Sequence, residues 1–181
     1  MPDRTEGVSS PAALAAPPAD ARLASLWNAH YADVLAYAQR RAAPDVAADV
    51  ASAAFSVLWR RIDEPPDDPL PWLYGVARRE LANQRRSARR RQALLARLSL
   101  RRSLPPGPTD PADHAVEGAA ARAALARLRP DDREVLMLVA WEGLSPQRAA
   151  AALGVSTPAF AVRLHRARRR LEEQLSTQEQ T

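Results

Sequence analysis

Apolar side chains recur every three or four residues along most of the chain, and prolines or polar stretches interrupt this pattern. The first half therefore predicts a helix from Asp20 to about Ala42, a second from Asp45 to about Ile62 and a long third from about Leu70 to Leu98. On the second of these helices, Phe55 and Trp59 lie one turn apart, and we expect both to pack in the core.

The second half repeats the helical pattern after a break. Residues 99–114 are dense in proline and glycine, so they cannot continue a helix and instead predict a flexible linker. Helices are then expected from Ala115 to Leu128 and from Pro130 through Trp141. The pattern indicates an all-α chain of two small domains, with a tail at each end: residues 1–19, 20–98, 99–114, 115–176 and 177–181 form tail, domain, linker, domain and tail.

The stretch from Leu144 to Leu171 reads as two short helices joined by a tight turn. Ser145 and Ser156 are candidate N-caps, each followed closely by proline, and Gly154 suits the end of the first helix. On the second helix Phe160, Leu164, Ala167 and Leu171 share an apolar stripe, whereas Val162 and Arg166 point the other way and Arg163 lies at the flank. This arrangement is typical of a helix-turn-helix that lays its second helix in the major groove of DNA.

The third helix carries most of its positive charge in two adjacent rows. The first row contains Arg78, Arg85 and Arg89, and the second contains Arg79, Arg86, Arg90 and Arg97. Glu80 is the single acidic residue of that stretch. Since such a face would repel itself if it were merely solvated, we interpret it as a binding surface for an anionic ligand.

The amino-acid composition further limits the classes of function that are expected. The chain has 26 basic side chains, all of them arginine, against 21 acidic ones, and it contains no cysteine. No signal peptide or membrane-spanning run is evident, which predicts a cytoplasmic protein without membrane insertion. The three histidines are far apart and no phosphate-binding glycine loop occurs, so we expect no enzyme activity, metal, cofactor or small-molecule substrate.

Several blocks, among them WLYGVAR from Trp72, LRPDDREVL from Leu128 and RLHRARRRL from Arg163, resemble the extracytoplasmic-function group of bacterial sigma factors. The resemblance implies a promoter-specificity subunit of RNA polymerase whose partners are promoter DNA and core polymerase. The first domain would bind the polymerase clamp through its second helix and the melted minus-ten element through its third. The second domain would bind the flap and read the minus-thirty-five element, and an anti-sigma factor is left open as a further partner.

The resemblance also assigns residues to three contact surfaces. For the minus-ten element they are Arg78, Arg79, Asn83, Arg85, Arg86 and Arg89. For the minus-thirty-five element they are Ser156, Thr157, Ala159, Val162, Arg163 and Arg166. For core polymerase they are Asp49, Ser52 and Ala53, on a helix face that is small and thinly charged.

The chain departs from the family pattern at three places. Ser52-Ala53 replaces a glutamine and an acidic residue, Arg79 replaces an asparagine, and Ala161-Val162 replaces a basic residue and serine. An outward valine can contact apolar groups such as a thymine methyl, which leaves hydrogen-bond readout mainly to Arg166 and Arg163. Two alternatives therefore stay open, a stand-alone helix-turn-helix regulator and a sigma-like interaction protein with reduced promoter activity.

Overall fold

The computed structural model describes residues 17–98 and 119–179, and these residues form seven α-helices and no strand. The helices are α1 (Ala19–Gln39), α2 (Pro44–Trp59), α3 (Pro69–Leu98), α4 (Ala119–Arg127), α5 (Pro130–Ala140), α6 (Pro146–Leu153) and α7 (Thr157–Glu179). The predicted all-α class is confirmed. The predicted linker, 99–114, and nearly all of the predicted N-terminal tail lie outside the described residues.

Proline, rather than an acidic cap, sets the start of α2. The sequence predicts that this helix begins at Asp45, but Ala43 is the N-cap and Pro44 occupies the first turn ahead of Asp45. The reason is that proline already has a helical φ and gives up no hydrogen bond at this position. Asp45 still lies in the first turn, where its charge suits the helix dipole.

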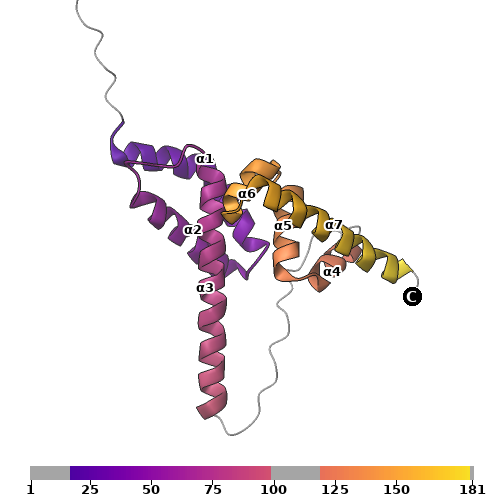
Figure 1. Ribbon diagram of the computed structural model, residues 1–181. Coiled ribbons are helices and arrows are strands. Elements are labelled where there is room, and N and C mark those ends of the chain that lie inside the picture. Colours follow the sequence, from indigo (N-terminus) through magenta and orange to yellow (C-terminus); the bar gives the residue numbers. More distant parts are fainter. Residues whose placement is uncertain (1–16, 99–118, 180–181) are drawn as a thin grey trace, which may run out of the picture.

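In the first domain, α1 and α2 pack against each other and against α3. Val34, Leu58 and Leu73 are fully buried, and many of their neighbours are alanines, which let the helix axes approach closely. From residue 82 to residue 95, no side chain of α3 is buried. This part of the 30-residue helix, which is about 45 Å long overall, projects past the other helices as a bare rod (Figure 1).

The second domain, α4 to α7, is built around Phe160, which is completely buried at the start of α7. Arg133 of α5 donates from Nε to the carbonyl oxygen of Leu125 at 2.8 Å, which satisfies a carbonyl at the C-terminal end of α4. Arg170 of α7 pairs with Asp132 of α5 at 2.6 Å. These contacts join α5 to α4 and α7 to α5.

The helix-turn-helix forms as the sequence predicts. The backbone N–H of Arg148 donates to Ser145 Oγ at 3.3 Å, and that of Ala159 donates to Ser156 Oγ at 3.4 Å. Gly154 ends α6 with φ of 66°, a left-handed conformation that glycine adopts without steric cost. The second helix, α7, continues to Glu179, past the predicted domain limit at 176.

Replacing Phe160 by alanine should destabilise the second domain by about 3–5 kcal/mol, because it leaves a large cavity in a small core. Val162→Ala is the matched control, since Val162 is 51% exposed on the opposite face of the same helix and should change stability by no more than about 0.5 kcal/mol. Hydrogen exchange of the α5 and α7 amides measures both. Equal losses of protection in the two variants would contradict the assignment of the buried face.

Candidate nucleic-acid interface

The exposed face of α7 carries the residues predicted to contact duplex DNA. Val162, Arg163 and Arg166 are exposed, whereas Phe160 and Leu164 on the other face are buried. Arg166 has no hydrogen bond or ion pair with any described residue, so its guanidinium is available for a ligand. The remaining predicted residues, Ser156, Thr157 and Ala159, form the first turn of the same helix and its cap.

Most arginines of the two rows on α3 are exposed and poorly neutralised, namely Arg79, Arg85, Arg86, Arg89 and Arg90. Glu80, which could have paired with them, instead accepts hydrogen bonds from the amides of Asn83 at 3.4 Å and Gln84 at 3.2 Å. Within the described part of the chain, Arg79 and Arg89 have no partner. The predicted surface on α3 therefore remains positively charged and can bind an anionic ligand.

Three residues predicted for the minus-ten element are held by local contacts. Arg86 donates to the side-chain oxygen of Asn83, so these two side chains form a polar pair one turn apart. Arg85 donates from Nη2 to the backbone carbonyl of Arg41 at 3.0 Å, which ties it to the end of α1. A ligand at this surface must therefore exchange some internal hydrogen bonds for its own.

The face of α2 predicted to bind polymerase contains a tryptophan that sequence reasoning placed in the core. Phe55 is buried as expected, but Trp59 is 41% exposed, so that prediction is wrong. The spacing from Asp49 to Ser52, Ser56 and Trp59 is three, four and three residues, which puts all four on one helix face. This spacing is the signal that would have placed Trp59 beside the predicted patch. Asp49 and Ser52 are exposed and Ala53 is half-buried.

The two domains contact each other through α6, which packs on α3, and through ion pairs from Arg41, just after α1, to Glu134 in α5 and Glu142 just after it. Arg41 is 5% exposed and pairs with Glu134 and Glu142, each at 2.8 Å. Its guanidinium lies 3.6 Å from the centroid of the Tyr37 ring. Arg40 also pairs with Glu142, whose side chain is fully buried. Arg40 and Arg41, which directly follow α1, thus form ion pairs between the two domains.

Tyr37 takes part in the same contact. Its hydroxyl donates to Glu134 Oε1 at 2.7 Å, and its ring stacks on that of Tyr74. Burial, followed by the negative charge of Glu134, raises the pKa of Tyr37 well above its ordinary value of 10.0. Burial acts to lower the pKa of Arg41, but the charges of Tyr37, Glu134 and Glu142 raise it overall.

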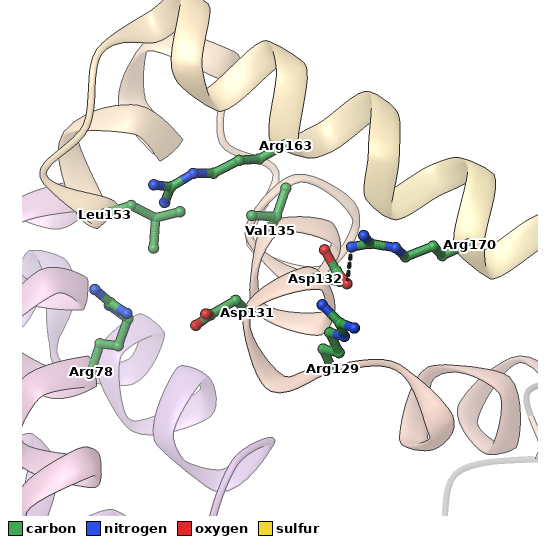
Figure 2. A pocket seen from close by; sticks show the side chains of 8 residues that line it. All are labelled: Arg78, Arg129, Asp131, Asp132, Val135, Leu153, Arg163 and Arg170. Atoms are coloured by element: carbon green, nitrogen blue, oxygen red, sulfur yellow. Dashed lines mark hydrogen bonds and ion pairs between the residues drawn. The ribbon is translucent and has the colours of Figure 1, made fainter.

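A cavity of about 320 Å³ lies between the two domains. Figure 2 shows Arg78 entering it from α3 and Arg163 from α7, with the carboxylate of Asp131 pointing toward Arg78. Arg129 also lines it, while Arg170 on the far side is occupied by Asp132. The structure thus brings together one residue from each predicted DNA surface, and the other predicted DNA contacts do not line this cavity.

Comparison with known proteins defines the class of this chain. Residues 26–91 match the family model of sigma-70 region 2, and residues 119–171 match that of sigma-70 region 4. The chain is 33% identical over 133 residues to the RNA polymerase sigma factor CnrH of Cupriavidus metallidurans and covers 70% of its length. The chain therefore belongs to the sigma-70 family of RNA polymerase sigma factors. Within that family it is a member of the extracytoplasmic-function group.

Other relatives are matched over less of their length. The chain is 36% identical over 134 residues to the extracytoplasmic-function sigma factor SigD of Mycobacterium tuberculosis, and the match covers 74% of this chain and 63% of SigD. It is 36% identical over 140 residues to the probable sigma factor RfaY of Xanthomonas campestris, covering 72% of this chain and 35% of RfaY. The chain thus spans less than two thirds of these two relatives.

A solved structure supports the fold. The sigma factor RpoE of Bartonella quintana, crystallised with the anti-sigma factor NepR, superposes with a TM-score of 0.61 at 24% identity. The match covers 84% of this chain and 96% of the other. The arrangement of helices is therefore that of a known sigma-factor fold.

Tyr37 should ionise well above pH 10.0 in the native protein and near that value after unfolding. Because its native pKa is raised, its contribution to stability is complete below pH 10.0 and is lost as the pH rises through the raised value. Tyrosinate absorbance during an alkaline titration, compared with Tyr37→Phe, measures this. If Tyr37→Phe removed an absorbance step at or below pH 10.0, the conclusion that the Tyr37 phenol is buried would be contradicted.

Proposed function

We propose that this chain is a promoter-specificity subunit that directs core RNA polymerase to particular promoters and supports DNA melting at initiation. The observation that carries the proposal is a pair of arginine-bearing faces on two separate domains of a sigma-factor fold. A stand-alone helix-turn-helix regulator would use the face of α7 for DNA binding, but the exposed arginines of α3 would then have no ligand.

The second domain would read the minus-thirty-five element. Ser156, Thr157 and Ala159 would enter the groove first, since they lie at the N-terminal end of α7. Arg166 would supply bidentate hydrogen bonds to a guanine edge, while Val162 could offer only an apolar contact. Arg163 would reach in from the flank. This surface has few base-reading groups, so we expect it to be selective at few base positions.

The first domain would hold the melted minus-ten element along α3. Arg79, Arg85 and Arg89 would neutralise phosphates and stack on bases, and Asn83 could read a base edge once its amide leaves Glu80. Arg78 and Arg86 complete the surface. Because these contacts are mainly electrostatic, their contribution to affinity should fall as salt concentration rises.

Core polymerase would bind the α2 face that contains Asp49, Ser52 and Ala53, with Trp59 added to it. Tryptophan is enriched among residues that dominate binding energy at interfaces, and a half-exposed one beside a small-residue patch suits that role. This aromatic contact would compensate for the polar residues that Ser52 and Ala53 replace. The clamp and the flap of polymerase are the proposed sites for the first and second domains.

The remaining aspects of the proposal concern chemistry and location. We propose that the chain acts by binding and not by catalysis, without a cofactor, in the cytoplasm and on the nucleoid when part of holoenzyme. Among the described residues no helix is long and apolar enough to cross a membrane. An anti-sigma factor is a proposed partner, supported by the solved sigma factor RpoE, whose structure contains the anti-sigma factor NepR.

A pull-down on core polymerase combined with run-off transcription tests the proposal. Core binding with promoter-dependent initiation is the expected result. Promoter binding without any core binding would favour the stand-alone regulator. Core binding without initiation at any promoter would favour the sigma-like interaction protein with reduced promoter activity.

Arg166→Ala should relax promoter selection, because it removes about 1–3 kcal/mol of discrimination at one upstream base pair. Arg89→Ala should instead weaken binding evenly across promoters and reduce the slope of log affinity against log salt by about 1. Run-off competition between promoter variants and a salt titration distinguish the two effects. Unchanged promoter preference in Arg166→Ala would show that the recognition face is assigned wrongly.

Trp59→Ala should weaken binding to core polymerase by about 2 kcal/mol, or roughly 30-fold, if the tryptophan anchors the interface. Leu94→Ala is the matched control, because Leu94 is 58% exposed in the first domain but lies on α3, away from the proposed α2 face. Fluorescence anisotropy of labelled protein titrated with core polymerase provides the affinities. Equal effects of the two substitutions would remove Trp59 from the proposed interface.

A further inference from the structure

Three arginines line the cavity between the two domains without a partner of their own. Arg78 comes from α3, Arg129 is the N-cap residue of α5, and Arg163 comes from α7 (Figure 2). Among the described residues, none of these three side chains forms a hydrogen bond or an ion pair. Guanidinium groups around one cavity repel one another, so an anion placed between them is stabilised. The cavity therefore has the charge of an anion-binding site.

The two carboxylates of the cavity do not cancel this charge. Asp132 is already paired with Arg170, at 2.6 Å. Asp131 points toward Arg78 but forms no ion pair within the described part of the chain. Four arginines against two aspartates leave the lining with two positive charges. An unpaired carboxylate accepts hydrogen bonds, so Asp131 suits a ligand that carries an N–H or O–H donor besides its anionic groups.

The size and the walls of the cavity indicate a small molecule. Its volume of about 320 Å³ lies at the lower end of the roughly 300–1,000 Å³ of small-molecule sites, which often lie at domain boundaries. A DNA duplex, whose major groove alone is about 12 Å wide, cannot enter it. Val135 and Leu153 make part of the wall apolar, which suits one face of an organic ring.

We propose that this cavity binds a nucleoside diphosphate. Its two linked phosphate groups would bind Arg78, Arg129 and Arg163, because arginine binds phosphate oxygens bidentately. Three guanidinium groups from three separate segments are better matched by two phosphate groups than by one. The nucleoside would lie against Leu153, and a donor of its base or ribose would bind the Asp131 carboxylate.

The site overlaps the proposed DNA surfaces only in part. Arg129 belongs to none of the surfaces proposed for DNA or polymerase, whereas Arg78 and Arg163 each belong to one. A bound diphosphate would occupy both of these arginines, so ligand and promoter DNA would compete for them. This competition rests on the proposed function, but binding of the ligand does not.

Isothermal titration calorimetry of the full chain at about 0.15 M salt tests the site, with GDP, sodium pyrophosphate and sodium sulfate as probes. Pyrophosphate has the phosphate groups of GDP without its donors, and sulfate is a single anion. GDP should bind about tenfold more tightly than sulfate and about threefold more tightly than pyrophosphate. GDP that binds no better than sulfate would overturn the site. Pyrophosphate that binds as tightly as GDP would overturn the contact with the nucleoside.

Matched substitutions locate the ligand. Arg78→Gln and Arg129→Gln should each weaken GDP binding by about tenfold, because each removes one phosphate contact. Arg79→Gln in α3 and Arg127→Gln at the end of α4 remove the same charge from exposed positions outside the cavity, and they should change the affinity by less than about twofold. Equal losses in all four variants would indicate general attraction and overturn the site. A loss confined to one domain would overturn its position between the domains.

Asp131→Asn separates the phosphate contacts from the donor contact. It removes a negative charge from the cavity, so pyrophosphate should bind more tightly. It also replaces an accepting oxygen by a donor, so the preference for GDP over pyrophosphate should be lost. Equal gains in affinity for the two ligands would overturn the contact between Asp131 and the nucleoside.

Run-off transcription tests the competition, with a limiting amount of the chain incubated with GDP before core polymerase and promoter DNA are added. GDP should lower the transcript from the wild type about threefold more than the transcript from Arg129→Gln, which loses the ligand but no proposed DNA contact. Equal inhibition of the two proteins would overturn the competition. Absence of transcript from both proteins without GDP would overturn the proposed function, while calorimetry would still decide the site.

Discussion

The cost of burying an arginine without a partner determines how this chain packs. Along α3, Leu73, Ala77 and Leu81 are buried, and between residues 82 and 95, where arginines are dense, no side chain is buried. Unpaired guanidinium groups cannot be desolvated cheaply, so the arginines of this part of the helix remain in contact with water. One helix therefore supplies both a buried packing face for the first domain and a long charged surface.

Arg41 is an arginine that is buried, and it has the partners that burial requires. These partners are two carboxylates, a tyrosine hydroxyl nearby and an aromatic face against its guanidinium. Those carboxylates, on Glu134 and Glu142, come from the second domain. The first domain by itself would leave Arg41 without these partners, which links the electrostatics of one domain to the position of the other.

Sequence reasoning succeeded where a feature depends on neighbours along the chain. The faces of α7, the cap at Ser145 and the left-handed Gly154 follow from local spacing and backbone chemistry. It failed where the partner is distant. Nothing near Arg41 reveals Glu142, and a tryptophan such as Trp59 is assigned to the core by its size unless the whole helix face is traced. The roles of the individual DNA-facing residues remain predictions, because they depend on molecules outside the chain.

The arginine rows of α3 also limit how the cell could modulate this surface chemically. Lysine loses its charge on acetylation, but the chain has no lysine, so its side chains offer no substrate for that modification. Guanidinium groups also stay protonated at any physiological pH. Neither acetylation nor a physiological change of pH can therefore remove the positive charge of the rod. Nucleic-acid binding by this surface would instead be controlled by its accessibility or by a competing acidic surface that covers it.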